Sequence, residues 1–311
     1  MKKTLKKLIS AFRALLLGDL PSMMSTILNQ IEVNSLLLAK LHTEKMMEAK
    51  EVASLKDVEF KVFSQWGEDG IIQYIVSNIP IENKIFIEFG VNNYKESNTR
   101  FLLINDNWKG LVIDSNPGHI ECIKQDPVYW QHDLTAICQW VTRENINKII
   151  AAAGISGDIG LLSIDLDGND YWVWEIIDVV SPRIVICEYN SVFGDDCAVV
   201  VPYDPHFNIS DAHYSNLYFG CSLPALCKLA GIKGYNFIGS DSTGCNAFFV
   251  RKDLSQPFKV ISAKQGYIES KFRISRDKHR QRSYISGKDR ASLIADLDIY
   301  DLELETTRPL K

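Results

Sequence analysis

Residues 84–93 read KIFIEFGVNN, and this short stretch decides the class of fold. The apolar run at 85–87 ends in Glu88, and Gly90 follows two residues later. Such runs are typical of strands buried on both faces of a parallel sheet. Glycine allows the backbone to turn sharply and to approach a ligand closely. The stretch therefore predicts a buried strand that ends in a tight, ligand-facing turn.

Three further apolar runs end in an acidic residue, at 110–114, 161–165 and 184–188. Segments of helical length, such as 97–105 and 144–153, lie between the runs. Alternating strands and helices predict a doubly wound α/β sheet. Nearer the end, apolar runs at 235–239 and 247–250 flank the turn-rich segment 240–244, which predicts an antiparallel hairpin that closes the edge of the sheet.

Composition excludes several classes of protein. The 311 residues are 46% hydrophobic and 23% charged, which suits one large α/β domain with extensions. A net charge of −5 argues against nucleic acid as a partner, because that binding needs a concentrated basic surface. No apolar run is long enough for a transmembrane helix. Seven cysteines without a Cys-x-x-Cys pair predict reduced thiols and a cytoplasmic location.

The chain is expected to have three parts: an N-terminal helical extension (1–57), a Rossmann-like domain (58–262) and a polar C-terminal extension (263–311). Apolar residues at 5–16 recur at helical spacing opposite lysines, and Met24 to Leu41 follow a heptad pattern that Asn34 interrupts. Three interpretations of these helices are open. They lie on the main domain, they join copies of the chain into a homo-oligomer, or the basic first helix makes a peripheral membrane contact.

Glu88, Asp114, Asp165 and Glu188 all stand at predicted strand ends. Ligands bind at the carboxyl ends of the strands in open α/β sheets. Any single acid is equally well explained as a helix cap, but four at one edge favour a binding site. A dinucleotide site needs three glycines to seat its pyrophosphate, and here only Gly90 is present. This disfavours a dinucleotide-dependent oxidoreductase.

Longer motifs resemble a known family. The segments 64–72 (SQWGEDGII), 86–91, 97–100, 161–172 (LLSIDLDGNDYW) and 185–190 are similar to FkbM-type methyltransferases and their relatives in surface-polysaccharide gene clusters. The similarity runs from about Phe63 to Val250. It implies a class I methyltransferase sheet, parallel with one reversed last strand, and S-adenosylmethionine as the cofactor.

The resemblance also implies roles for individual residues. Glu88 and Gly90 would line the methionine part of the cofactor, and Asp114, followed by Ser115, would hold its ribose. Gln65 and Glu68 would close over the amino-acid end. Relatives usually carry a second glycine where this chain has Asn92, a departure that bears on cofactor binding. Asparagine tolerates the left-handed backbone better than other non-glycine residues, so Asn92 remains among the expected cofactor-binding residues.

The segment 165–170 (DLDGND) adds a candidate metal site. If the strand continues, Asp165 and Asp167 point the same way, as Glu188 and Asn190 do on the next strand. Oxygen ligands of this kind suit Mg²⁺. By similarity to macrolide-sugar O-methyltransferases, Asp165, Glu188 and Asn190 would be ligands and Asp167 the general base. The alternative is a helix-capping turn without metal.

Two further features remain open. His206 and His213 lie in a segment that resembles a substrate loop, which makes His213 an alternative base. Tyr171, Trp172 and Trp174 are either sugar-stacking or core residues. Together the sequence predicts an S-adenosylmethionine-dependent O-methyltransferase of a sugar or glycan hydroxyl, Mg²⁺-assisted, in surface-polysaccharide biosynthesis. The alternative is a catalytically inactive Rossmann-fold scaffold in glycan assembly.

Overall fold

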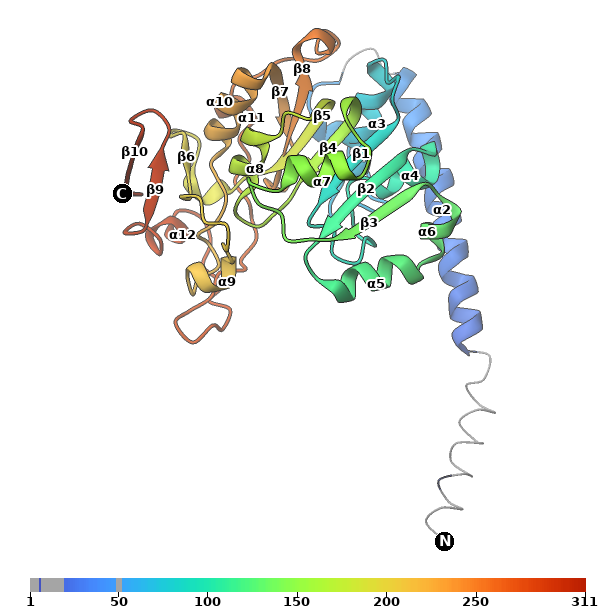
Figure 1. Ribbon diagram of the computed structural model, residues 1–311, viewed down its shortest axis with the longest axis horizontal. Coiled ribbons are helices and arrows are strands. Elements are labelled where there is room, and N and C mark those ends of the chain that lie inside the picture. Colours follow the sequence, from blue (N-terminus) through green and yellow to red (C-terminus); the bar gives the residue numbers. More distant parts are fainter. Residues whose placement is uncertain (1–5, 7–19, 49–51) are drawn as a thin grey trace. The chain divides into compact units, whose positions relative to one another are not determined.

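The computed structural model describes residue 6, residues 20–48 and residues 52–311 (Figure 1). The chain divides into two compact units, Met1–Glu48 and Ala49–Lys311. The second unit contains both sheets and every cavity discussed below.

The first unit contains one long helix, α2 (Leu20–Glu48). Pro21 lies in its first turn, where a missing N–H costs no hydrogen bond. The predicted helix over the heptad segment is confirmed, and heptad residues such as Ile27, Leu38 and Leu41 are exposed. The helix expected at 5–16 lies outside the described residues. Oligomerisation and membrane contact stay predictions. No described helix is long and apolar enough to cross a membrane.

The main sheet has seven strands in the order β3-β2-β1-β4-β5-β8-β7. Their bounds are β1 (Ile85–Phe89), β2 (Lys109–Asp114), β3 (Leu134–Cys138), β4 (Gly157–Ile164), β5 (Val180–Glu188), β7 (Tyr235–Ser240) and β8 (Asn246–Arg251). Strands β1 to β5 pair in parallel, whereas β8 runs antiparallel to both β5 and β7. The expected Rossmann-like sheet with a reversed last strand is confirmed.

The position of the reversed strand differs in detail from the expectation. The hairpin forms as predicted, but β8 inserts between β5 and β7, so β7 occupies the edge of the sheet. Strand β3 was not predicted. Its alternating pattern of buried and exposed residues lacks the continuous apolar run that revealed the other parallel strands, because it lies at the opposite edge.

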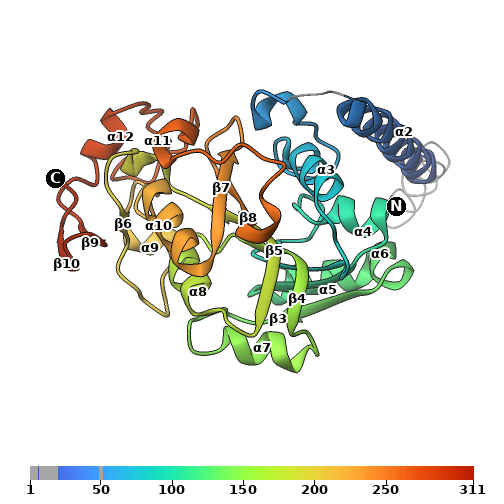
Figure 2. The same ribbon diagram turned by 90° about the horizontal axis from the view of Figure 1, so that it is seen from above.

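Helices cover both faces of the sheet (Figure 2). The α-helices of the second unit with six or more residues are α3 (Glu68–Asn78), α4 (Arg100–Asp106), α5 (Pro117–Gln125), α7 (Ile146–Ala152), α8 (Asp170–Ile176) and α10 (Leu223–Lys233). One core cluster joins α7, α8 and α10 to β1, β2, β4, β5 and β8, with Trp174 among its largest buried side chains. Figure 2 shows α3 and α4 on the opposite face. This packing fixes the strand ends around which the site is built.

Short elements complete the unit. They are η1 (Leu55–Val58), α6 (Pro127–Gln131), η2 (Ser191–Phe193), β6 (Val199–Val200), α9 (Ile209–Ala212), η3 (Lys252–Leu254), α11 (Ala263–Gly266), α12 (Asp289–Ser292), β9 (Asp298–Asp301) and β10 (Thr306–Pro309). Strands β6, β9 and β10 form a second, antiparallel sheet of three strands. The segment 263–311, expected as a separate extension, therefore pairs with strand β6 of the second unit.

Candidate functional site

A cavity of about 310 Å³ opens at the carboxyl ends of β1, β2, β3 and β4. Strands β1 and β4 are neighbours, and the chain winds away from them in opposite directions. This is the topological switch point at which open α/β sheets bind ligands. The lining residues are Gly90, Asn92, Ile113, Asp114, Ser115, Asn116, His119, Gln139, Trp140, Val141, Asp165, Leu166, Asp167, Asn169, Phe207, Asn208 and Ile209.

Gly90 makes the turn after β1 possible. Its φ is +72°, and a Cβ at this position would lie 1.8 Å from the carbonyl oxygen of Asp165. Its N–H donates to the carbonyl of Ile113, 3.0 Å away. Only glycine fits here, because both the backbone angle and the close approach to the β4 tip exclude a side chain. Asn92, two residues on, has φ +48°, the left-handed conformation that asparagine tolerates.

Asp114 ties this turn to the end of β2. One carboxylate oxygen accepts from the N–H of Asn92 at 2.8 Å. The other accepts from the N–H of Asn116 at 2.8 Å and lies 3.0 Å from Nδ1 of His119. A carboxylate offers about four acceptor positions, so Asp114 retains capacity for a ligand hydroxyl. Ser115 lies beside it on the cavity wall.

Glu88 does not line this cavity, although the resemblance assigns it to the cofactor. Its buried carboxylate accepts from the hydroxyls of Ser97 and Thr99 and from the N–H groups of Asn98 and Thr99. The pKa of Glu88 is raised, because the effect of burial is larger than the opposing effect of these hydrogen bonds. In the structure, Glu88 therefore holds in place the segment that leads into α4.

Gln65 and Glu68 are also absent from the cavity wall. Gln65 is exposed. Glu68 is fully buried: one carboxylate oxygen accepts from the N–H groups of Trp66 and Gly67, and the other accepts from the side-chain amide of Asn246 on β8. Glu68 thus joins the start of α3 to the reversed strand. The expectation that both residues close over the cofactor remains untested.

Asp165, Asp167 and Glu188 bring three carboxylate oxygens within 4.8 Å of one another. The sequence analysis predicted that Asp165 and Asp167 would converge, but through the alternation of side chains along a continuing strand. Strand β4 ends at Ile164, and Asp167 has φ +53°, so a turn rather than strand alternation brings the two side chains together. Asp170 holds this turn by accepting from the N–H groups of Leu166 and Gly168.

Asn190 forms structural hydrogen bonds of its own, and its role as a metal ligand stays a prediction. Its side-chain amide donates to the carbonyls of Leu217 and Phe219, and its oxygen accepts from the N–H of Val192. Strand β5 ends at Glu188, so the alternation that would have aligned Asn190 with it is lost. Asn190 instead caps η2 and anchors a loop. Asp167, the predicted base, contributes the third carboxylate of the cluster.

The cluster carries strong like-charge repulsion. Water reaches Asp165 through the cavity, yet the surrounding protein desolvates it enough to raise its pKa well above the usual range, and Asp167 and Asp170 raise it further. The pKa of Glu188 is also raised well above its usual range, mainly by burial and next by the nearby charge of Asp165. The Oε2 atom of Glu188 is buried without a hydrogen-bond partner among the described residues. An unpartnered, buried carboxylate oxygen beside two other carboxylates is suited to a cation.

The two histidines of the predicted substrate loop lie apart from the cavity wall. His206 is exposed, while Nδ1 of His213 lies 2.7 Å from the hydroxyl of Ser215, and burial lowers the pKa of His213. Phe207, Asn208 and Ile209 between them do line the cavity. The loop therefore reaches the site, but through other residues than those expected.

Tyr171, Trp172 and Trp174 are packing residues. Tyr171 and Trp174 belong to the main core, and the indole N–H of Trp172 donates to the carbonyl of Val201. Trp140, by contrast, lies on the cavity wall, is 42% exposed and donates to the carbonyl of Pro205. Gln139 and Trp140 were not predicted as site residues, because they follow β3, the strand that was not predicted.

Comparisons with known proteins add little to this geometry. No protein-family model matches the chain, and no curated protein matches it. One similar solved structure is an S-adenosylmethionine-dependent methyltransferase from Clostridium acetobutylicum ATCC 824, with 10% identity over 59% of this chain and 90% of that chain and a TM-score of 0.38. Another is PKMT2 from Rickettsia typhi, with 9% identity over 59% of this chain and a TM-score of 0.36. This chain spans about half (52%) of that protein. Similarity this low leaves function to be inferred from the site itself.

Proposed function

We propose that this protein is an S-adenosylmethionine-dependent methyltransferase. The observation that carries the proposal is the charge of the cavity at the switch point. Asp114, Asp165 and Asp167 line it, and no lysine or arginine does so among the described residues. A dinucleotide brings a pyrophosphate, which requires positive partners or a glycine-rich helix N-terminus. S-adenosylmethionine carries a sulfonium and an ammonium group, which an acidic cavity favours.

The lining residues suit the parts of such a cofactor. Asp114 stands at the end of β2 with free acceptor capacity for ribose hydroxyls. The Gly90 turn leaves room for a ligand against backbone, and Trp140 and Gln139 present a flat apolar surface and an amide beyond β3. The cofactor supplies the electrophilic methyl group, so the protein has to orient the acceptor and remove its proton.

The proposal also includes a Mg²⁺ ion that assists the transfer. Asp165 and Glu188 would hold it, with Asp167 beside them as the base, and the unpartnered Oε2 of Glu188 is the observation that fits a cation. When bound, Mg²⁺ would make a neighbouring hydroxyl more acidic and fix a diol in one orientation. Without a cation, three carboxylates this close repel one another, which is costly unless the arrangement serves binding.

The acceptor in this proposal is a hydroxyl of a sugar or glycan in surface-polysaccharide biosynthesis. Asp167 lies on the cavity wall, is exposed and would accept the hydroxyl proton. Burial raises the pKa of Asp167 and so makes it a better base than an ordinary aspartate. The exposed indole of Trp140 offers the apolar face that sugar rings stack on.

Calorimetry with S-adenosylmethionine and with NAD tests the proposal. We expect saturable binding of S-adenosylmethionine and none of NAD, because the cavity lacks cations for a pyrophosphate. Asp114→Asn should weaken the binding of S-adenosylmethionine by about tenfold, because the variant loses a negative charge and acceptor positions for hydrogen bonds. Asp133→Asn, an exposed acid outside the cavity, serves as the control. Binding of NAD but not of S-adenosylmethionine would overturn the proposal.

Asp167→Asn tests the base. We expect turnover to fall by about 100-fold or more, while binding of S-adenosylmethionine is largely retained. The assay follows labelled methyl transfer to a panel of nucleotide sugars and oligosaccharides. Asp211→Asn removes an exposed charge from α9, beside the same loop, and should have no effect. Unchanged turnover in Asp167→Asn would contradict its role as the base.

The same variant distinguishes a base from a ligand. Retained binding of Mn²⁺, used in place of Mg²⁺, with lost turnover identifies a base, whereas loss of both identifies a metal ligand. If the native protein binds S-adenosylmethionine but methylates no acceptor in the panel, the scaffold alternative becomes the better interpretation.

A further inference from the structure

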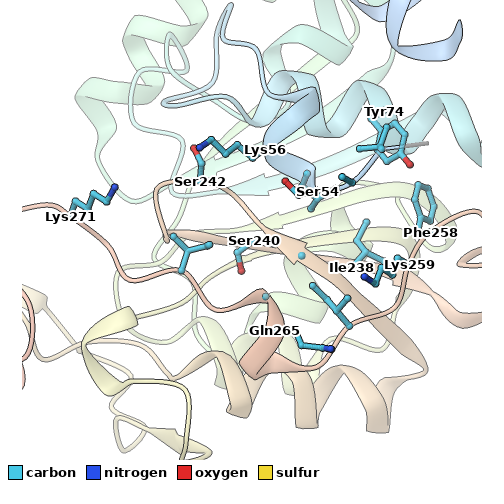
Figure 3. A pocket seen from close by; sticks show the side chains of 17 residues that line it. Ser54, Lys56, Tyr74, Ile238, Ser240, Ser242, Phe258, Lys259, Gln265 and Lys271 are labelled. Atoms are coloured by element: carbon cyan, nitrogen blue, oxygen red, sulfur yellow. The ribbon is translucent and has the colours of Figure 1, made fainter. Parts of the chain in front are cut away.

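A second cavity, of about 510 Å³, lies in the same unit and shares no lining residue with the first (Figure 3). It is bounded by η1 and the residues before it, by Tyr74 of α3, by the end of edge strand β7, and by the segment around α11. Its volume is within the range of small-molecule sites. The methyl-transfer proposal does not use this cavity.

Apolar side chains form much of its wall. They are Val52, Leu55, Ile238, Phe258, Ile261 and Ile268. The rings of Tyr74 and Phe258 meet edge to face, with centroids 5.6 Å apart. The lining would therefore take up an apolar chain or ring from water.

Lysines supply all the formal charge of the lining. Lys56, Lys259 and Lys271 line the cavity, and no aspartate or glutamate does so among the described residues. All three are exposed, and none forms an ion pair with a described carboxylate. In Figure 3, Lys56 and Lys271 lie toward Ser242, and Lys259 lies toward Phe258. Because the chain as a whole has five more acidic than basic residues, such a cluster is a local reversal of charge.

Hydrogen bonds hold the walls in place. The Glu59 carboxylate accepts from both the N–H and the hydroxyl of Ser242, each at 2.6 Å, which ties the segment after η1 to the β7–β8 hairpin. The N–H of Ile261 donates to the carbonyl of Phe237 on β7. The hydroxyl of Tyr189, the residue after β5, donates to the carbonyl of Ile268. A cavity with walls fixed in this way is preformed, which lowers the entropic cost of binding.

We propose that this cavity binds an amphipathic anion: an apolar chain or ring that carries a phosphate or carboxylate group. The apolar walls would take the hydrocarbon, and Lys56 and Lys271, on the Ser242 side of the cavity, would face the anionic end. The two cavities of the second unit would then select ligands of opposite charge, since the first is lined by carboxylates and the second by ammonium groups. The proposal does not rest on methyltransferase activity and is tested apart from it.

Calorimetry with dodecyl phosphate below its micelle concentration tests the site. We expect saturable binding to one site, weaker binding of decanoate, and no binding of inorganic phosphate or dodecyltrimethylammonium, because both the chain and the negative charge are required. Equal binding of the cationic and anionic amphiphiles would overturn the proposal, as would no binding of dodecyl phosphate.

Variants locate the binding. Lys56→Glu combined with Lys271→Glu should weaken the binding of dodecyl phosphate by about tenfold or more. Lys148→Glu, which changes an exposed lysine of α7 outside both cavities, should leave that binding unchanged. Ala53→Trp, at an exposed lining position, should block the cavity without disturbing the core. The thermal unfolding temperature of each variant reports folding independently. Unchanged dodecyl phosphate binding in these variants would contradict the assignment.

Discussion

Gly90→Ala is expected to abolish measurable binding of S-adenosylmethionine. The added Cβ would stand 1.8 Å from the carbonyl oxygen of Asp165, a backbone atom, so the β1 turn or the acidic turn has to move. Either displacement disturbs the cavity, because both turns form its wall. We expect a loss of affinity of about 100-fold or more, measured by calorimetry, since strained or displaced backbone costs on the order of 1–3 kcal/mol per residue.

Gly154→Ala provides a matched control. Gly154 has φ +74°, nearly the same as Gly90, but a Cβ there meets nothing within 4 Å. The substitution should lower stability by about 1 kcal/mol from backbone strain alone and leave cofactor binding unchanged. Thermal unfolding and calorimetry of the two variants separate strain from steric displacement. Normal cofactor affinity in Gly90→Ala would mean that this turn does not shape the binding site.

Asp165→Asn is expected to raise the thermal stability of the metal-free protein and to remove saturable Mn²⁺ binding. Asp165 lies within 4.8 Å of carboxylate oxygens of Asp167 and Glu188, and their repulsion contributes to its raised pKa. An amide of the same shape relieves that repulsion, so the variant gains stability while losing a ligand. Melting curves with and without Mn²⁺ give both results. Mn²⁺ should raise the melting temperature of the native protein and leave that of the variant unchanged.

Asp296→Asn serves as the control for this pair of measurements. Asp296 is exposed and forms no ion pair among the described residues. Its neutralisation changes the net charge of the protein equally but should alter neither the melting temperature nor its response to Mn²⁺. If Asp165→Asn lowers the stability of the metal-free protein, the acidic cluster is a structural network and the Mg²⁺ proposal fails. If native protein shows no Mn²⁺ response, the same conclusion follows.

Both variants act where the tips of β1 and β4 meet, and that meeting point connects the two parts of the proposal. Gly90 packs against the carbonyl of Asp165, so the cofactor turn and the acidic turn share one contact. A metal ion at Asp165 and a cofactor at Gly90 would each limit the movement of the same backbone. We therefore expect Mn²⁺ and S-adenosylmethionine to stabilise the protein together more than the sum of their separate effects.

The fold class, and the edge of the sheet that carries the site, follow from local patterns in the sequence. Buried parallel strands require continuous apolar runs, and such runs are visible without a structure. That is why β1, β2, β4 and β5 were predicted, together with the acids that end them. Gly90 was also recognisable, because a glycine directly after such a strand has a backbone role that other residues cannot fill. Strand β3 lies at an edge, and its weaker pattern concealed Gln139 and Trp140.

The direction of each side chain depends instead on contacts that form when the chain folds. Glu88 forms its hydrogen bonds with the segment that follows β1, and Asn190 forms its own with a loop 27 to 29 residues further along the chain. Asp167 joins Asp165 because the strand ends early and the backbone enters the left-handed region. The lysine-lined cavity draws Lys56 and Lys259 from segments about 200 residues apart. Local patterns fix elements and their ends, whereas the choice among possible partners depends on which loops the fold brings together.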